Sequence, residues 1–167
     1  PILSTLFDLT GTSSSDPIRN VTIQGLIFTE TRPTFMDART NPSGGDWSLE
    51  RSGAIFVENA ENISIQGNTF KRLDSNAISI NGYTRDVLVD ENEFVWLGQN
   101  AITSWGRSNR SDATEGNFPR KTRVTRNFVH EIGHIQKQSS FYFQAITAEV
   151  ELSHNIVFNI PRAAINF

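Results

Sequence analysis

The chain has 167 residues, a formal net charge of −3, 12 phenylalanines and no cysteine. This length suits one domain, and the missing cysteines exclude a disulfide framework, thiolate zinc sites and a cysteine nucleophile. The charge does not indicate wholesale nucleic-acid binding, and no apolar run approaches the roughly 20 residues of a membrane-spanning helix.

Short strand-like segments follow one another along the chain. Ile outnumbers Leu, and β-branched and aromatic side chains fit a pleated strand. No segment keeps a 3.6-residue period over the roughly 10–12 residues that a helix needs, and Asn, Gly and Ser interrupt each segment. In chain order, the predicted strand-bearing segments are 2–9, 20–28, 52–57, 62–70, 75–80, 86–94, 99–104, 123–132, 143–147, 150–160 and 162–167.

These segments belong to an internal repeat. Residues 62–83 match residues 86–107 at an offset of 24 positions. The coinciding pairs include Ile63 and Val87, Ile65 and Val89, Asn68 and Asn92, Phe70 and Phe94, Asn76 and Asn100, and Ile78 and Ile102. A 24-residue unit with three short strands predicts one coil of a parallel β-helix, in which coils lie about 4.8 Å apart and bury their inner faces only by stacking.

One short motif recurs five times, as SGAIF, SNAIS, QNAIT, FQAIT and RAAIN. Strand alternation predicts an inward column of Ile55, Ile78, Ile102, Ile146 and Ile165. It also predicts outward residues, which include Phe56, Ser79, Thr103, Thr147 and Asn166, and an outward row of small residues, Ala54, Ala77, Ala101, Ala145 and Ala164. Such a row either lets a ligand approach the backbone closely or simply suits a flat sheet.

Four asparagines, Asn68, Asn92, Asn127 and Asn155, fall at the same turn of successive units. A side-chain amide both donates and accepts hydrogen bonds, so a stack of them satisfies backbone groups that the turn leaves unpaired. We therefore predict a structural asparagine ladder.

The uneven spacing of the other copies predicts three long insertions, at 29–52, 106–120 and 133–143. All three border the sheet of the recurring motif, and long insertions in a compact domain are usually functional or flexible. Together they would wall a groove of roughly 24 Å, which suits an extended polymer better than a small metabolite.

The repeats resemble right-handed parallel β-helix proteins of the pectate-lyase-like superfamily. The stretches PTFMDARTNPSGGDWSLERSGAIF, RLDSNAISI, KQSSFYFQA and NIPRAAINF are similar to a eukaryotic, algal-type branch of it. The resemblance implies one all-β domain over 1–167, a right-handed solenoid of about five to six coils. It also implies that the chain continues beyond PRAAINF. Relatives in the superfamily include polysaccharide lyases, hydrolases, epimerases and non-catalytic adhesins.

Five residues are predicted to be catalytic, namely Lys137, Tyr142, Arg162, Asp46 and Glu50. A lyase needs a base and a cation beside a uronate carboxylate, roles that Lys, Tyr and Arg fill. Asp46 and Glu50 fit the carboxylate pair of a glycoside hydrolase. The alternatives are a Ser-Gly-Gly-Asp turn with Glu50 in a salt bridge, and a structural salt bridge for Arg162.

Five more residues are predicted to bind substrate, namely Trp47, Trp105, Arg107, Gln144 and Asn166. The two tryptophans suit stacking on sugar rings, and the others border the same sheet. His130 and His134 are spaced like a helical zinc pair, but their segment is not helical, so neither a metal nor a cofactor is expected. The basic stretch 119–126 is either a solvated turn or a contact for an anionic ligand.

The predicted function is that of a secreted or cell-surface protein that binds or cleaves an extended, anionic polysaccharide. The alternative is a non-catalytic structural or adhesive module, with end-to-end self-association or further coils beyond both termini. Three Asn-x-Ser/Thr sites, at Asn20, Asn62 and Asn109, are candidates for glycosylation.

Overall fold

The computed structural model describes residues 1–37 and 50–167. Within these residues the chain forms strands joined by turns and contains no helix. The described part therefore also lacks any helix long and apolar enough to cross a membrane. The all-β class predicted from the sequence is confirmed.

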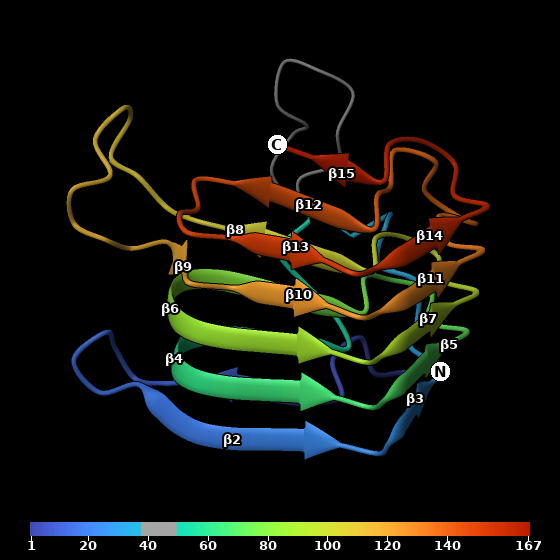
Figure 1. Ribbon diagram of the computed structural model, residues 1–167, viewed down its shortest axis with the longest axis horizontal. Coiled ribbons are helices and arrows are strands. Elements are labelled where there is room, and N and C mark those ends of the chain that lie inside the picture. The colour runs from blue at the N-terminus through green and yellow to red at the C-terminus, as the bar shows by residue number, and fades with distance from the viewer. Residues whose placement is uncertain (38–49) are drawn as a thin grey trace.

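The strands stack in parallel as a solenoid-like body with three ladders (Figure 1). The first ladder contains β1 (Phe7–Thr10), β4 (Ile55–Gln66), β6 (Ile78–Asp90), β8 (Ile102–Trp105), β12 (Tyr142–Ala145) and β15 (Ile165–Asn166). The second contains β2 (Ile18–Gln24), the later halves of β4 and β6, β9 (Pro119–Arg120), β10 (Arg123–Thr125) and β13 (Glu151–Ser153). The third is a separate five-stranded sheet of β3 (Ile27–Thr29), β5 (Thr69–Lys71), β7 (Glu93–Val95), β11 (Phe128–His130) and β14 (Ile156–Phe158).

The strand register reproduces the repeat offset of 24 residues. Ile78 pairs with Ile102 in the first ladder, and Phe70 pairs with Phe94 in the third. The inward phenylalanines form a continuous ring stack, because Phe28 lies 4.7 Å from Phe70 and Phe70 lies 4.9 Å from Phe94 between centroids. The matching residues of each repeat thus fill one shared core.

The asparagine ladder is confirmed. Asn92 donates from Nδ2 to the carbonyl oxygen of Ile65 (2.8 Å) and to Oδ1 of Asn127 (3.1 Å). Its own Oδ1 accepts the backbone N–H and the side-chain amide of Asn68, each at 3.0 Å. The ladder continues to Asn155, whose Oδ1 accepts from Asn127.

The predicted register is wrong at the fourth copy of the motif. Tyr142, not Ile146, pairs with Ile102, and Tyr142 is fully buried in the core. Ile146 lies four residues later, at a corner with a φ of 59° and 42 % exposed. Residues 145–147 repeat the letters of the motif, but residues 141–143 take its place in the ladder, and Ser140 takes the place of the motif asparagine, since its N–H donates to Oδ1 of Asn100.

The predicted outward row of alanines is wrong for its first three members. Ala54, Ala77 and Ala101 are fully buried in the core, whereas Ala145 is half-buried and Ala164 is exposed. Each buried alanine precedes the first residue of a strand, where the chain turns into the first ladder. Strand alternation does not extend across that corner, so the alanine and the following isoleucine both contact the core.

Candidate functional site

The outer face of the first ladder is covered in its middle. Ser79 and Asn81 are fully buried, Thr103 is 1 % exposed and Trp105 is 3 % exposed. Hydrogen bonds join the polar groups, since Asn81 Nδ2 and Thr103 Oγ1 both donate to Ser79 Oγ at 2.9 and 3.1 Å. The prediction of an open groove along this face is therefore wrong at these positions.

Trp105 is enclosed by an arginine and a second ring. The guanidinium of Arg51 lies 5.2 Å from the centroid of the Trp105 ring and donates to the carbonyl oxygens of Trp105 (3.2 Å) and Gly106 (2.8 Å). The ring of Phe143 lies 4.5 Å from that of Trp105. These neighbours leave no free ring face, so the predicted stacking of Trp105 on a sugar is contradicted.

A charged cluster lies beside this enclosed tryptophan. Arg107 donates from Nε and Nη2 to Oε1 of Glu58, at 3.2 and 2.8 Å. Partial desolvation and the nearby charge of Arg107 lower the pKa of Arg51, while Glu58 opposes the change. The cluster therefore brings two guanidinium groups to one carboxylate at the edge of the first ladder.

Residues 107–117 form an arm that projects from this edge (Figure 1, yellow). The N–H of Arg107 donates to the carbonyl oxygen of Asn117 at 2.8 Å and closes the base of the arm. Arg85 holds the end of the arm by donating to the carbonyl oxygens of Gly116 (2.8 Å) and Phe118 (2.7 Å). The arm corresponds to the predicted insertion at 106–120.

Two polar hollows lie beside this arm, and Ser14 of the turn at 11–17 lines one of them. One hollow of about 390 Å³ is lined by Arg107, Ser108, Asn109, Glu115 and Asn117. A second, of about 340 Å³, is lined by Ser14, Asn59, Tyr83, Glu115 and Asn117. The two hollows share the lining residues Glu115 and Asn117, and we call them together the arm groove.

The wall of the arm groove is fixed by neighbouring hydrogen bonds. The hydroxyl of Tyr83 donates to Glu61 at 2.6 Å, and Arg19 donates to the other oxygen of Glu61 at 2.8 Å. These two bonds lower the pKa of Glu61, and the bond to Glu61 raises the pKa of Tyr83. The ring of Tyr83 also lies 4.2 Å from the guanidinium of Arg85, so its position is set before any ligand arrives.

Two of the predicted catalytic residues are buried in the described part of the chain. Tyr142 is fully buried, and this burial raises its pKa to about 12. Glu50 is 4 % exposed and accepts hydrogen bonds from the hydroxyls of Thr34 and Ser52. Both predictions are corrected on this ground, because a core side chain does not reach a polymer. Asp46 lies outside the described residues.

The remaining predicted basic residues, Lys137 and Arg162, are both exposed. They lie in equivalent connections, between β11 and β12 and between β14 and β15. These connections touch, since a Cβ on Gly133 would lie 2.4 Å from Cγ of Pro161. Joint action of Lys137 and Arg162 on one carboxylate stays a prediction.

Of the predicted substrate-binding residues, Arg107 lines the arm groove. Gln144 pairs with Ser104 in the first ladder, and its Oε1 is buried. Asn166 is half-buried and pairs with Phe143 in the last strand of the first ladder. Trp47 lies outside the described residues. The structure thus does not gather the predicted set at one place.

All three candidate glycosylation sites are exposed. Asn62 donates from Nδ2 to Oδ1 of Asn20 at 2.7 Å, whereas Asn109 stands on the arm and lines the first hollow of its groove. Glycosylation stays a prediction at each.

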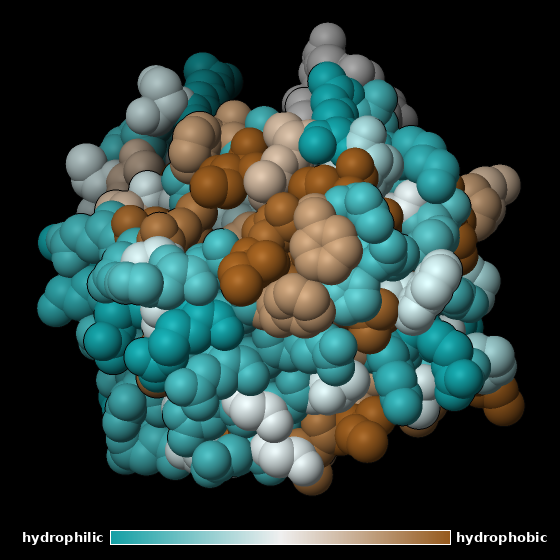
Figure 2. Space-filling view, turned by 45° about the vertical axis from the view of Figure 1, so that its right-hand side comes forward, coloured by the Kyte–Doolittle hydropathy of each residue, from teal (hydrophilic) through white to brown (hydrophobic). Residues whose placement is uncertain are grey.

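A second surface, the outer face of the third ladder, is partly apolar (Figure 2). Phe128 and Phe158 are 39 % and 42 % exposed, and the ring of His130 stacks on that of Phe158 with centroids 5.2 Å apart. Glu131 contacts His130 and accepts a hydrogen bond from Asn159 at 2.8 Å. Both bonds lower the pKa of Glu131, and the bond from Asn159 has the larger effect.

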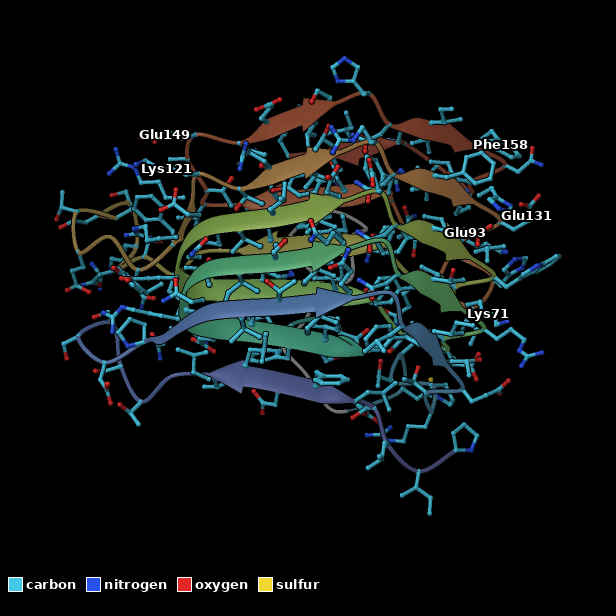
Figure 3. All side chains as sticks on the ribbon, turned by 60° about the horizontal axis from the view of Figure 1, so that its bottom comes forward. Lys71, Glu93, Lys121, Glu131, Glu149 and Phe158 are labelled. Atoms are coloured by element: carbon cyan, nitrogen blue, oxygen red, sulfur yellow. The ribbon has the colours of Figure 1, made fainter. Side chains whose placement is uncertain are left out.

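Two carboxylates border this surface, because Glu93 is in β7 and Glu131 directly follows the neighbouring strand β11. Figure 3 shows Glu93 and Glu131 along the same edge as Phe158, with Lys71 at its far end. Lys121 and Glu149 lie at the opposite corner of the body. Among the described residues, no three His, Cys, Asp or Glu side chains are arranged to hold a metal ion.

Sequence reasoning did not find Glu58, Asn59, Tyr83, Glu115 and Asn117, which complete the site around Arg107. The insertion at 106–120 was a signal for two of them, because Glu115 and Asn117 lie inside it. The other three come from the turn between the first and second ladders of two different repeats. Only the stacking of those repeats brings them to the arm.

Comparison of the chain with protein-family models, with curated proteins and with solved structures found no match.

Proposed function

We propose that this protein is a right-handed parallel β-helix of about five to six coils, similar to the pectate-lyase-like superfamily, that binds an extended polysaccharide outside the cell. The arm groove is the proposed binding site. The supporting observation is that two polar hollows, one of them lined by Arg107, have Glu115 and Asn117 in common. A lining of amide, hydroxyl, carboxylate and guanidinium groups is suited to the hydroxyls of sugars.

Binding is tested with soluble polysaccharides by isothermal titration calorimetry. The panel contains neutral glucans, mannans and galactans and, because the sequence led us to expect an anionic polymer, polyuronates. Arg107→Ala should weaken binding, since Arg107 lines the groove. Arg72→Ala is the matched control, because Arg72 is an exposed arginine that pairs with a glutamate, Glu30, away from the arm groove. Equal loss in both variants would contradict the assignment of the site.

Cleavage is tested separately by measuring reducing ends and unsaturated products after incubation with the same panel. The arm groove contains a carboxylate, Glu115, within a polar lining, and general acid or base catalysis requires such a group within reach of the substrate. If the protein is an enzyme at this site, Glu115→Gln abolishes turnover. A protein that only binds releases no product in either form.

The second candidate function is a non-catalytic adhesive or structural module. The observation that favours it is the apolar part of the third ladder, where Phe128, Ile156 and Phe158 are all exposed. Exposed apolar patches of this kind mark interaction surfaces. Self-association measured by light scattering should then depend on concentration and should disappear in Phe158→Asp, while Arg107→Ala leaves it unchanged.

A further inference from the structure

We propose that the arm groove selects an uncharged sugar residue and disfavours uronic acids. This inference rests on the proposed function and names the substrate class for the same site. It depends on the balance of charge, on the hydrogen-bonding capacity of the lining and on the size of the two hollows.

The charges at the arm groove balance one another. Among the described residues, Arg107 is the one cation and Glu115 the one anion that line the two hollows, and the other arginines around them, Arg19, Arg51 and Arg85, donate to Glu61 or to backbone carbonyl oxygens. An acidic sugar therefore meets a carboxylate as well as a guanidinium in this lining. A site that binds carboxylates normally offers an uncompensated cation, most often an arginine that can donate two hydrogen bonds.

Each of these arginines is already engaged. Arg51 donates to the carbonyl oxygens of Trp105 and Gly106, and Arg85 donates to three carbonyl oxygens at the base of the arm. Arg107 donates from two nitrogens to Glu58. A uronate carboxylate would have to compete with Glu58 for Arg107. It would also be repelled by Glu58, since like charges at close range disfavour each other.

The hydrogen-bonding groups of the groove that are not already used are mostly acceptors. Asn59 uses Nδ2 to donate to the carbonyl oxygen of Gly11 at 3.1 Å, which leaves its Oδ1 to accept. The hydroxyl of Tyr83 donates to Glu61, which leaves the phenolic oxygen to accept. Glu115 adds two further acceptor oxygens. A sugar hydroxyl donates to such groups, whereas an ionised carboxylate only accepts.

The donors that balance this lining are the Nδ2 amide of Asn117 and the hydroxyl of Ser14, which line the same hollow. A sugar hydroxyl donates and accepts at once, so it can bridge Glu115 and Asn117. The hollows of about 390 and 340 Å³ lie at the small end of the roughly 300–1,000 Å³ range of ligand pockets. They suit a short run of sugar rings that contacts Asn117 and Glu115, the two residues common to both linings.

The experiment compares tetrasaccharides of three kinds by calorimetry, namely neutral hexoses, uronic acids and hexosamines. The protein is produced in a host that does not glycosylate it, because Asn109 lines the first hollow. We expect a neutral tetrasaccharide to bind with an affinity that changes less than about twofold between low and high salt, since screening acts on charged partners. Asn117→Ala should weaken that binding about tenfold, the fold-change for roughly 1.4 kcal/mol.

The matched control is Gln24→Ala, which removes an exposed amide on the second ladder and should leave binding unchanged. Tighter binding of the uronic acid, lost at high salt and in Arg107→Ala, would overturn the neutral class and leave the proposed function standing. Tighter binding of the hexosamine, lost in Glu115→Gln, would overturn it likewise. If no tetrasaccharide and no polysaccharide bind, the proposed function fails, and this inference fails with it.

Discussion

Removing one member of the asparagine ladder should destabilise the whole stack. Asn92 is 1 % exposed, and its side chain makes four hydrogen bonds that connect three successive repeats. Each buried hydrogen bond contributes about 1 kcal/mol net, and a buried partner left unsatisfied costs about 1–3 kcal/mol. Relaxation of the turn recovers part of this, so Asn92→Ala should lower the free energy of unfolding by about 3–5 kcal/mol.

The measurement is equilibrium unfolding in urea, followed by circular dichroism and analysed by linear extrapolation. Asn109→Ala is the matched control, because it makes the same chemical change on the exposed arm and should shift stability by less than about 0.5 kcal/mol. If Asn92→Ala were as stable as Asn109→Ala, the side-chain ladder would not stabilise the turn, and the reasoning would be refuted.

Three further predictions concern the core and one surface carboxylate. Ile78→Ala should cost about 2–5 kcal/mol through a cavity, because Ile78 is fully buried, whereas Ile156→Ala, at a position 60 % exposed, should cost far less; similar urea midpoints for the two would contradict the inward assignment. Tyr142→Phe should keep the fold and any activity, and should remove the tyrosine that titrates near pH 12 in an absorbance titration; loss of turnover with an intact fold would restore Tyr142 as a catalytic candidate. The lowered pKa of Glu131 means that its ion contributes stability above its unfolded pKa of about 4.3 and that this is lost as pH falls through the folded value. Melting temperatures of the parent and Glu131→Gln should therefore differ near pH 6 and converge in acid, and a constant gap would contradict this.

The inward columns of the first two long repeats followed directly from the sequence. Ile63, Ile65 and Ile78 recur as apolar residues 24 positions later, and a strand places alternate residues on one face. Asn68 and Asn92 could be assigned for the same reason, since a polar residue at a fixed position among buried neighbours needs partners in the next repeat. Local pattern was sufficient where the repeat length was constant.

The pattern failed where chain length varied between repeats. The letters at 145–147 matched the motif, but Tyr142 fills the core position, and the sequence does not show how many residues a connection uses before the next strand begins. Ala77 was misplaced because alternation stops at a corner. Both errors arose at turns, where backbone geometry and not side-chain period decides direction.

What the sequence alone determined is the strand content, the repeat and the stacking of like residues, because these depend on periodicity and on burial of apolar side chains. What only the tertiary structure decided is the site. Asn59, Tyr83 and Asn117 are far apart in the chain and share a hollow only because successive repeats stack and Arg85 fixes the arm against them. The tertiary structure also showed that Trp105 is covered, since Arg51 and Phe143 reach it from other repeats, and no spacing in the sequence encodes that contact.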